Sequence, residues 1–218
     1  MLRPAVLAPG IEETILDTLA RRVHVLSLEQ LAGAWWGRAE RPLDAARRRL
    51  NQFVATGKLI QQTALARPFS FLVDRPVLTW EPPEPDPDFE ATSYRLKDRW
   101  AEPHRETVVY TASRQTGFRL GGFSGPIKHP DQVTHDLLLA QVYLFCLKNH
   151  PLVASHWVGE ECYRDEHRGE KIPDAKILDD ATPPNVALVI ESGGEYDASR
   201  VDAFHRSCKE KALPYQLW

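Results

Sequence analysis

An acidic, proline-rich segment does most to limit how this chain can fold. Residues 81–88 read Glu-Pro-Pro-Glu-Pro-Asp-Pro-Asp, so four prolines are interspersed with four acids. Proline disrupts a helix interior and cannot complete the hydrogen bonds of a central strand. We therefore expect an extended, solvent-exposed linker over residues 81–88. It separates a predicted N-terminal domain, residues 1–80, from a predicted C-terminal domain, residues 89–218.

Three helices and a β-hairpin are expected in the N-terminal domain. In chain order they are a helix over residues 11–23, a helix from Ser27, a helix over residues 43–55, and strands over residues 58–63 and 69–73. The sequence Ser27-Leu28-Glu29-Gln30 fits a capping box at the start of the second helix. Gly57 has the position of a residue that ends the third helix.

The third helix carries the candidate binding surface of this domain. Its apolar positions define a buried side, and at about 100° per residue the polar positions point outward. The outward or flanking residues are Arg47, Arg48, Arg49, Asn51 and Gln52. Arginine and the amide side chains make bidentate contacts to guanine and adenine edges in the major groove. On the expected hairpin, Lys58, Gln61 and Arg67 are placed to reach phosphates.

Three helices followed by a hairpin is the order of elements in winged helix-turn-helix proteins. The stretch Arg47–Ile60 resembles the recognition helix and wing of that family, and the resemblance extends over residues 11–73. It implies double-stranded DNA as the partner and binding as a homodimer. The first 67 residues carry ten Lys/Arg and six Asp/Glu, which favours such a partner. A solvated helix face or a protein-docking surface is the alternative interpretation of the three arginines.

The C-terminal domain is expected to contain a buried helix and a β-meander. In chain order its expected elements are a helix over residues 89–100, paired strands over 107–111 and 118–120, a helix apolar on all sides over 135–148, strands over 155–158, 172–177 and 186–191, a helix over 199–212 and a strand over 215–218.

Two acids in this domain indicate metal chemistry. Residues 186–190 form a buried-strand run that ends on Glu191, and Asp174 lies on the preceding extended segment. An ionised carboxylate at the end of a buried strand costs several kcal/mol unless a cation offsets it. Two carboxylates on adjacent strands are the minimum set for holding Mg²⁺ against a phosphodiester.

The order of the C-terminal elements is similar to the PD-(D/E)XK nuclease-like core. More closely, residues 133–218 resemble the replication-relaxation family of plasmid, phage and mobile-element proteins, through Thr134–Leu137, Ile172–Ala175 and Leu188–Glu191. The resemblance implies an α/β (α+β) fold. It consists of an N-terminal winged helix-turn-helix followed by a PD-(D/E)XK restriction-endonuclease-like mixed sheet with flanking helices.

The nuclease pattern also implies roles for individual residues. Asp174 and Glu191 would bind Mg²⁺, and a lysine two residues after the Glu would position or activate the attacking water. That place is taken by Gly193, and Lys176, on the same strand face as Asp174, is the candidate replacement. Glu160 and Glu161 are candidates to complete the coordination. A solvated Lys176, ordinary strand-end acids and a degenerate pocket form the alternative interpretation.

The sequence therefore predicts a DNA-binding protein of the replication-relaxation type, with metal-dependent DNA nuclease or nickase activity at Asp174 and Glu191 left open. One alternative is a non-enzymatic transcriptional or replication regulator whose degenerate nuclease-like domain serves dimerisation. Another is an adaptor whose winged helix binds a protein. The chain has no apolar run of about 18 residues and no signal-peptide pattern at its start, so we expect no membrane partner and a cytoplasmic location.

Overall fold

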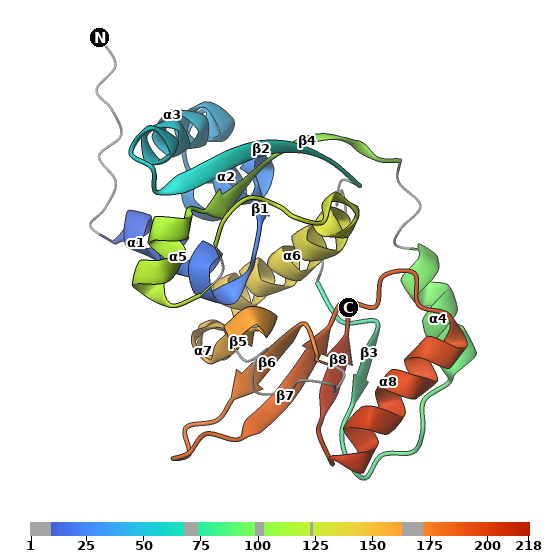
Figure 1. Ribbon diagram of the computed structural model, residues 1–218. Helices are drawn as coiled ribbons and strands as arrows, with labels where there is room; N and C mark the ends of the chain where they lie inside the picture. Colours follow the sequence, from blue (N-terminus) through green and yellow to red (C-terminus); the bar gives the residue numbers. More distant parts are fainter. Residues whose placement is uncertain (1–9, 68–73, 99–102, 123, 163–171) are drawn as a thin grey trace. The chain divides into compact units, whose positions relative to one another are not determined.

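The computed structural model describes residues 10–67, 74–98, 103–122, 124–162 and 172–218, which form a mixed α/β fold with two sheets (Figure 1). The chain groups into two compact units, and each unit takes two stretches of chain. The first unit contains the residues up to Ala66 together with Arg105–Ala140. The second contains Arg67–His104 together with Gln141–Trp218.

The first unit packs helices around a small antiparallel sheet. Its helices are α1 (Ile11–Asp17), the π-helical η1 (Thr18–Arg22), α2 (Leu28–Trp36), α3 (Pro42–Ala55), α5 (Arg114–Leu120), the short η2 (Pro130–Gln132) and the start of α6 (Val133–Asn149). Its strands are β1 (Leu26–Ser27), β2 (Leu59–Ala66) and β4 (Arg105–Ala112), in the order β1-β4-β2. Ile15 on α1, Leu31 on α2, and Leu50 and Phe53 on α3 are fully buried in this unit.

Local sequence signals fix the ends of α2 and α3 as expected. The Ser27 side chain accepts a hydrogen bond from the Gln30 backbone N–H (3.1 Å), and the Gln30 side chain accepts one from the Ser27 N–H (3.0 Å). The capping box is therefore confirmed. After α3, Gly57 has a φ of 68°, and Lys58 N donates to the carbonyl of Phe53 (2.8 Å). This Schellman ending turns the chain directly into β2.

The strand pairing of the first unit differs from the expected hairpins. All eight residues of β2 pair antiparallel with β4, from Leu59 opposite Ala112 to Ala66 opposite Arg105. The strand expected at 69–73 lies outside the described residues. The strand expected at 118–120 is wrong, because residues 114–120 form α5. Ser113 caps this helix by accepting a hydrogen bond from Thr116 N (3.2 Å).

The second unit is built on a five-stranded mixed sheet. Its elements are β3 (Leu78–Trp80), α4 (Phe89–Asp98), the end of α6, α7 (Pro151–Ser155), β5 (Trp157–Gly159), the short η3 (Glu160–Cys162), β6 (Ala175–Leu178), β7 (Val186–Glu191), α8 (Ala198–Glu210) and β8 (Tyr215–Leu217). The strand order is β3-β8-β7-β6-β5; β7 and β8 run parallel and the other neighbours antiparallel. The expected meander, helix and final strand are confirmed within a few residues.

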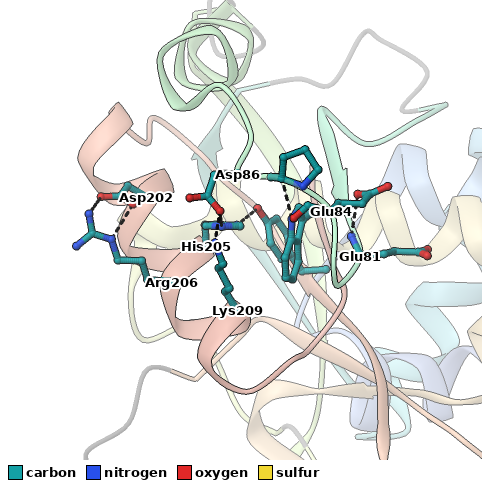
Figure 2. Close-up of polar contacts among 10 residues, drawn as sticks. Glu81, Glu84, Asp86, Asp202, His205, Arg206 and Lys209 are labelled. Carbon is teal, nitrogen blue, oxygen red and sulfur yellow. Dashed lines mark hydrogen bonds and ion pairs between the residues drawn. The ribbon is translucent and has the colours of Figure 1, made fainter.

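The proline-rich segment 81–88 is exposed, as expected, but it lies inside the second unit. The Trp80 indole N–H donates to the carbonyls of Glu84 (3.1 Å) and Pro85 (3.2 Å). Asp86 Oδ1 contacts His205 Nε2 (3.1 Å) and the Lys209 ammonium on α8 (Figure 2). These contacts fasten the segment to α8. The observed units therefore differ from the predicted division at 81–88, because β3 joins the C-terminal sheet and β4 returns to the first unit.

Candidate functional site

The exposed face of α3 carries the first candidate site. Ala46, Leu50 and Phe53 are buried on one side of the helix, as their spacing predicts. Arg47, Arg48, Asn51 and Gln52 are exposed on the other side. Arg47 and Asn51 are four residues apart, and Arg48 and Asn51 three, so these side chains occupy one surface. Two cations and an amide are thus presented together to solvent.

Arg49 and Lys58, two other predicted DNA contacts, form ion pairs with Glu12, a residue that the sequence did not single out. Glu12, on the first turn of α1, accepts from Arg49 Nη2 through Oε2 (3.2 Å) and contacts the Lys58 ammonium through Oε1. Arg49 Nη1 also donates to Gln52 Oε1 (2.5 Å). The side chains of Glu12, Arg49 and Lys58 are 27%, 38% and 40% exposed. This Glu12 cluster borders the exposed face of α3, because Arg49 and Gln52 belong to that helix.

The remaining predicted contacts have different surroundings. Gln61 is exposed on β2, and its Oε1 accepts a hydrogen bond from the hydroxyl of Tyr110, its partner on β4 (3.2 Å). Burial raises the pKa of Tyr110, which keeps this donor protonated. Arg67 belongs to the second unit, where it pairs with Glu195 (3.1 Å). The structure therefore places Arg67 with the second unit rather than on the β2 surface.

The predicted acid pair does come together in the second unit. Ala175 on β6 pairs with Ile190 on β7, so Asp174 lies opposite Glu191, and strand alternation puts both on one face of the sheet. Asp174 Oδ2 accepts a hydrogen bond from the backbone N–H of Ser192 (2.6 Å). This hydrogen bond links the residue before β6 to the residue that follows β7.

Glu191 is enclosed by its surroundings. Its side chain is 2% exposed, and the Tyr196 hydroxyl donates to its Oε1 (2.6 Å). Burial raises the pKa of Tyr196, and the charges of Glu191 and Asp174 raise it further. Both carboxylates therefore act on the same hydroxyl. Tyr196 also stacks under the Arg200 guanidinium, whose central carbon lies 4.3 Å from the ring centre.

The position of the missing lysine has no room for a side chain. A Cβ on Gly193 would lie 2.6 and 2.7 Å from the two methyl carbons of Leu96, which is fully buried in α4. The Gly193 N–H donates to the carbonyl of Trp218 (3.0 Å), so the backbone is held in this place. The glycine is therefore a packing requirement of the second unit.

Lys176 lines a cavity of about 190 Å³ between the sheet and α8. The other lining residues are Ile172, Pro173, Val186, Val189, Phe204, Ser207, Cys208, Lys211 and Leu213, so neither Asp174 nor Glu191 borders it. Lys176 does share a strand face with Asp174, as predicted, but it contributes to a largely apolar cavity.

The two glutamates proposed as further metal ligands follow β5. Glu160 is half-buried, and its backbone N–H donates to the carbonyl of Asp174 (3.1 Å). The side chain of Glu161 lies outside the described residues. Within the described parts of the chain, no group of three or more His, Cys, Asp and Glu side chains has a metal-binding arrangement. Among the described side chains, the predicted site therefore consists of the two carboxylates Asp174 and Glu191, and Glu191 is enclosed.

A further polar cluster surrounds the start of α6. Asp136 lies between His135 (Nδ1 at 3.3 Å) and His24 (Nδ1 at 3.7 Å). Burial opposes ionisation of Asp136, but the two histidines outweigh it and hold its pKa below the usual value. Asp136 is an acid in the first turn of α6, where a negative charge interacts favourably with the helix dipole. No signal in the sequence indicated the contact with His24, which is more than 100 residues earlier in the chain.

Comparisons of the chain with protein-family models, with curated proteins and with solved structures gave no match. In the described part of the chain, no helix combines the length and apolar character needed to cross a bilayer.

Proposed function

We propose that the chain is a DNA-binding protein of the replication-relaxation type that docks on duplex DNA through α3. The observation that carries this proposal is the exposed group Arg47, Arg48 and Asn51, backed by a buried apolar side of the same helix. The order α2, α3 and then the paired strands β2 and β4 supports a winged helix-turn-helix arrangement, in which α3 is the recognition helix.

Each side chain has a distinct contribution on this surface. Arg48 and Asn51 suit the edges of guanine and adenine, because their donors and acceptors form paired hydrogen bonds. Arg47 suits a phosphate, which adds affinity without sequence information. Binding should therefore combine a salt-dependent part with a sequence-dependent part.

Duplex binding measured across a salt series tests the proposal. Asn51→Ala should weaken a preferred sequence by about 5- to 150-fold, which corresponds to about 1–3 kcal/mol for a bidentate contact. Loss of Arg47 and Arg48 together should reduce the slope of log affinity against log salt by about 0.9, because only Arg47 is assigned to a phosphate. Arg206→Ala is the matched control, because Arg206 is an exposed arginine of the second unit paired with Asp202 (2.6 Å). Equal effects from Arg206 and α3 variants would contradict the proposal.

The enclosure of Glu191 favours a second unit that does not cut DNA. The Tyr196 hydrogen bond and the packing of Gly193 against Leu96 support a degenerate nuclease-like domain, as in a replication or transcription regulator. Sedimentation of the chain with and without a duplex measures whether this regulator binds as a homodimer.

Metal-dependent nicking is the second candidate function, favoured by the convergence of Asp174 and Glu191. Supercoiled plasmid incubated with the protein and Mg²⁺ or Mn²⁺ separates the two candidates. A regulator leaves the plasmid intact. Nicking that disappears in both Asp174→Asn and Glu191→Gln would instead establish the enzyme.

A further inference from the structure

Glu12 joins three elements of the first unit at one carboxylate. It stands on α1, and its two oxygens engage different cations: Arg49 from α3 and Lys58 from the turn between α3 and β2. As an acid in the first turn of α1, Glu12 interacts favourably with the dipole of that helix. The structure gives it a second set of contacts more than 30 residues away.

The two cations are held in place by more than Glu12. The central carbon of the Arg49 guanidinium lies 5.1 Å from the ring centre of Phe53, and the Lys58 ammonium lies 6.0 Å from the same ring. Arg49 also donates to Gln52. These contacts do not involve Glu12, so we expect both cations to remain beside the exposed face of α3 when their bond to Glu12 is broken.

We propose that Glu12 sets the DNA affinity of this chain by competing with DNA phosphates for Arg49 and Lys58. The inference rests on the proposed function, since it requires that α3 faces DNA. A carboxylate and a phosphate present similar oxygens to arginine and lysine, so the two anions exclude each other. Partly exposed ion pairs are weak, which allows DNA to displace the carboxylate.

The competition has a measurable electrostatic consequence. The Glu12 cluster has two positive charges and one negative charge, so removing the carboxylate doubles its net positive charge. A cation that neutralises a phosphate releases counterions from DNA, and each such contact adds about 0.9 to the salt slope. A cation already neutralised by Glu12 contributes less, because the displaced carboxylate attracts counterions in turn.

The test compares Glu12→Gln with Glu13→Gln in duplex binding across a salt series. Glu13 is the exposed neighbour on the same helix turn, so both variants change the net charge and the helix dipole equally. Relative to Glu13→Gln, we expect Glu12→Gln to bind about tenfold more tightly, with a salt slope steeper by about 1–2. In a chain carrying Arg49→Gln and Lys58→Gln, the two glutamate variants should bind equally.

A second measurement does not depend on the folding of Glu12→Gln. With Glu12 in place, loss of Arg49 and Lys58 together should change the salt slope less than loss of Arg47 and Arg48 together. The inference is overturned if the two double variants change the salt slope equally, or if Glu12→Gln binds no more tightly than Glu13→Gln. In either case, DNA binding by the unaltered chain still supports the proposed function. Absence of DNA binding by every variant and by the unaltered chain removes both.

Discussion

Gly193 is a position where packing determines the residue type, because a Cβ there would meet the side chain of Leu96. The nuclease pattern places a lysine there, but the methyl groups of Leu96 occupy the space that any side chain would enter. Because Leu96 is fully buried, it cannot move into solvent to make room. The departure from the pattern is therefore built into the core of the second unit and is not a surface change.

Gly193→Ala should destabilise the chain by about 1–3 kcal/mol, the usual cost of overpacking a well-filled core. Chemical denaturation measures this change. Gly33→Ala on α2 is the matched control, because a Cβ there meets nothing within 4 Å and alanine favours a helix by up to about 1 kcal/mol over glycine. Equal effects at both positions would show that Gly193 is not tightly packed.

Tyr196→Phe should destabilise the protein at neutral pH by about 1–3 kcal/mol, because a buried carboxylate loses its hydrogen-bond donor. In a chain carrying Glu191→Gln, Tyr196→Phe should lower the free energy of unfolding by less, because a buried neutral amide loses less than a buried carboxylate when the Tyr196 hydroxyl is removed. Tyr94→Phe is the control, because Tyr94 is 76% exposed on α4. The free energies of unfolding of the unaltered chain, the two single variants and the double variant give the coupling between Tyr196 and Glu191.

At the scale of elements, the segment 81–88 acts as a strap across α8. Its attachment depends on Asp86, whose pKa is lowered by hydrogen bonds from Lys209 and then from His205 (Figure 2). Asp86 is therefore ionised over a wider pH range in the folded chain than in the unfolded chain. The sequence indicated an extended, exposed segment, but the side chain that anchors it was hidden among four similar acids.

The lowered pKa of Asp86 predicts a pH-dependent contribution to stability. A depressed carboxyl pKa stabilises the folded state above the unfolded value of about 3.8 and loses this effect as pH falls through the folded value. Asp86→Asn should therefore lower the thermal midpoint at pH 6. The difference from the unaltered chain should shrink as pH falls below about 3.8 and disappear once pH is below the lowered pKa of Asp86. Glu81→Gln, on the same segment, should show no such convergence.

The sequence predicted local elements better than their pairing. The ends of α2 and α3 follow from capping residues a few positions apart, so they were readable from Ser27 and Gly57. The partner of β2 is β4, which begins 39 residues after β2 ends, and strand-forming residues alone do not specify a distant partner. Likewise, adjacent strand ends predicted the meeting of Asp174 and Glu191, whereas nothing local linked Glu12 to Arg49.

At the scale of the whole molecule, the two compact units alternate along the chain. Each unit is built from two stretches of sequence, and a stretch of the other unit lies between them. A fragment of residues 1–80 lacks β4, the central strand of the first sheet, so it should not unfold cooperatively. The register offers a sharper test, because Ala66 and Arg105 are direct partners at the end of the β2–β4 ladder. Opposite residues in an antiparallel pair lie about 5 Å apart, a distance that a two-residue turn can close.

We therefore expect residues 1–66 joined through Asn-Gly to residues 105–140 to fold as the first unit alone. Thermal unfolding followed by circular dichroism measures whether the joined chain unfolds cooperatively. The fragment of residues 1–80 is the control, because it lacks β4. Because Glu12 and the α3 surface lie in this unit, the joined chain should also keep the salt slope of DNA binding. An unfolded product would mean that the first unit requires the second for its stability, whereas a folded product without DNA affinity would place the binding surface elsewhere.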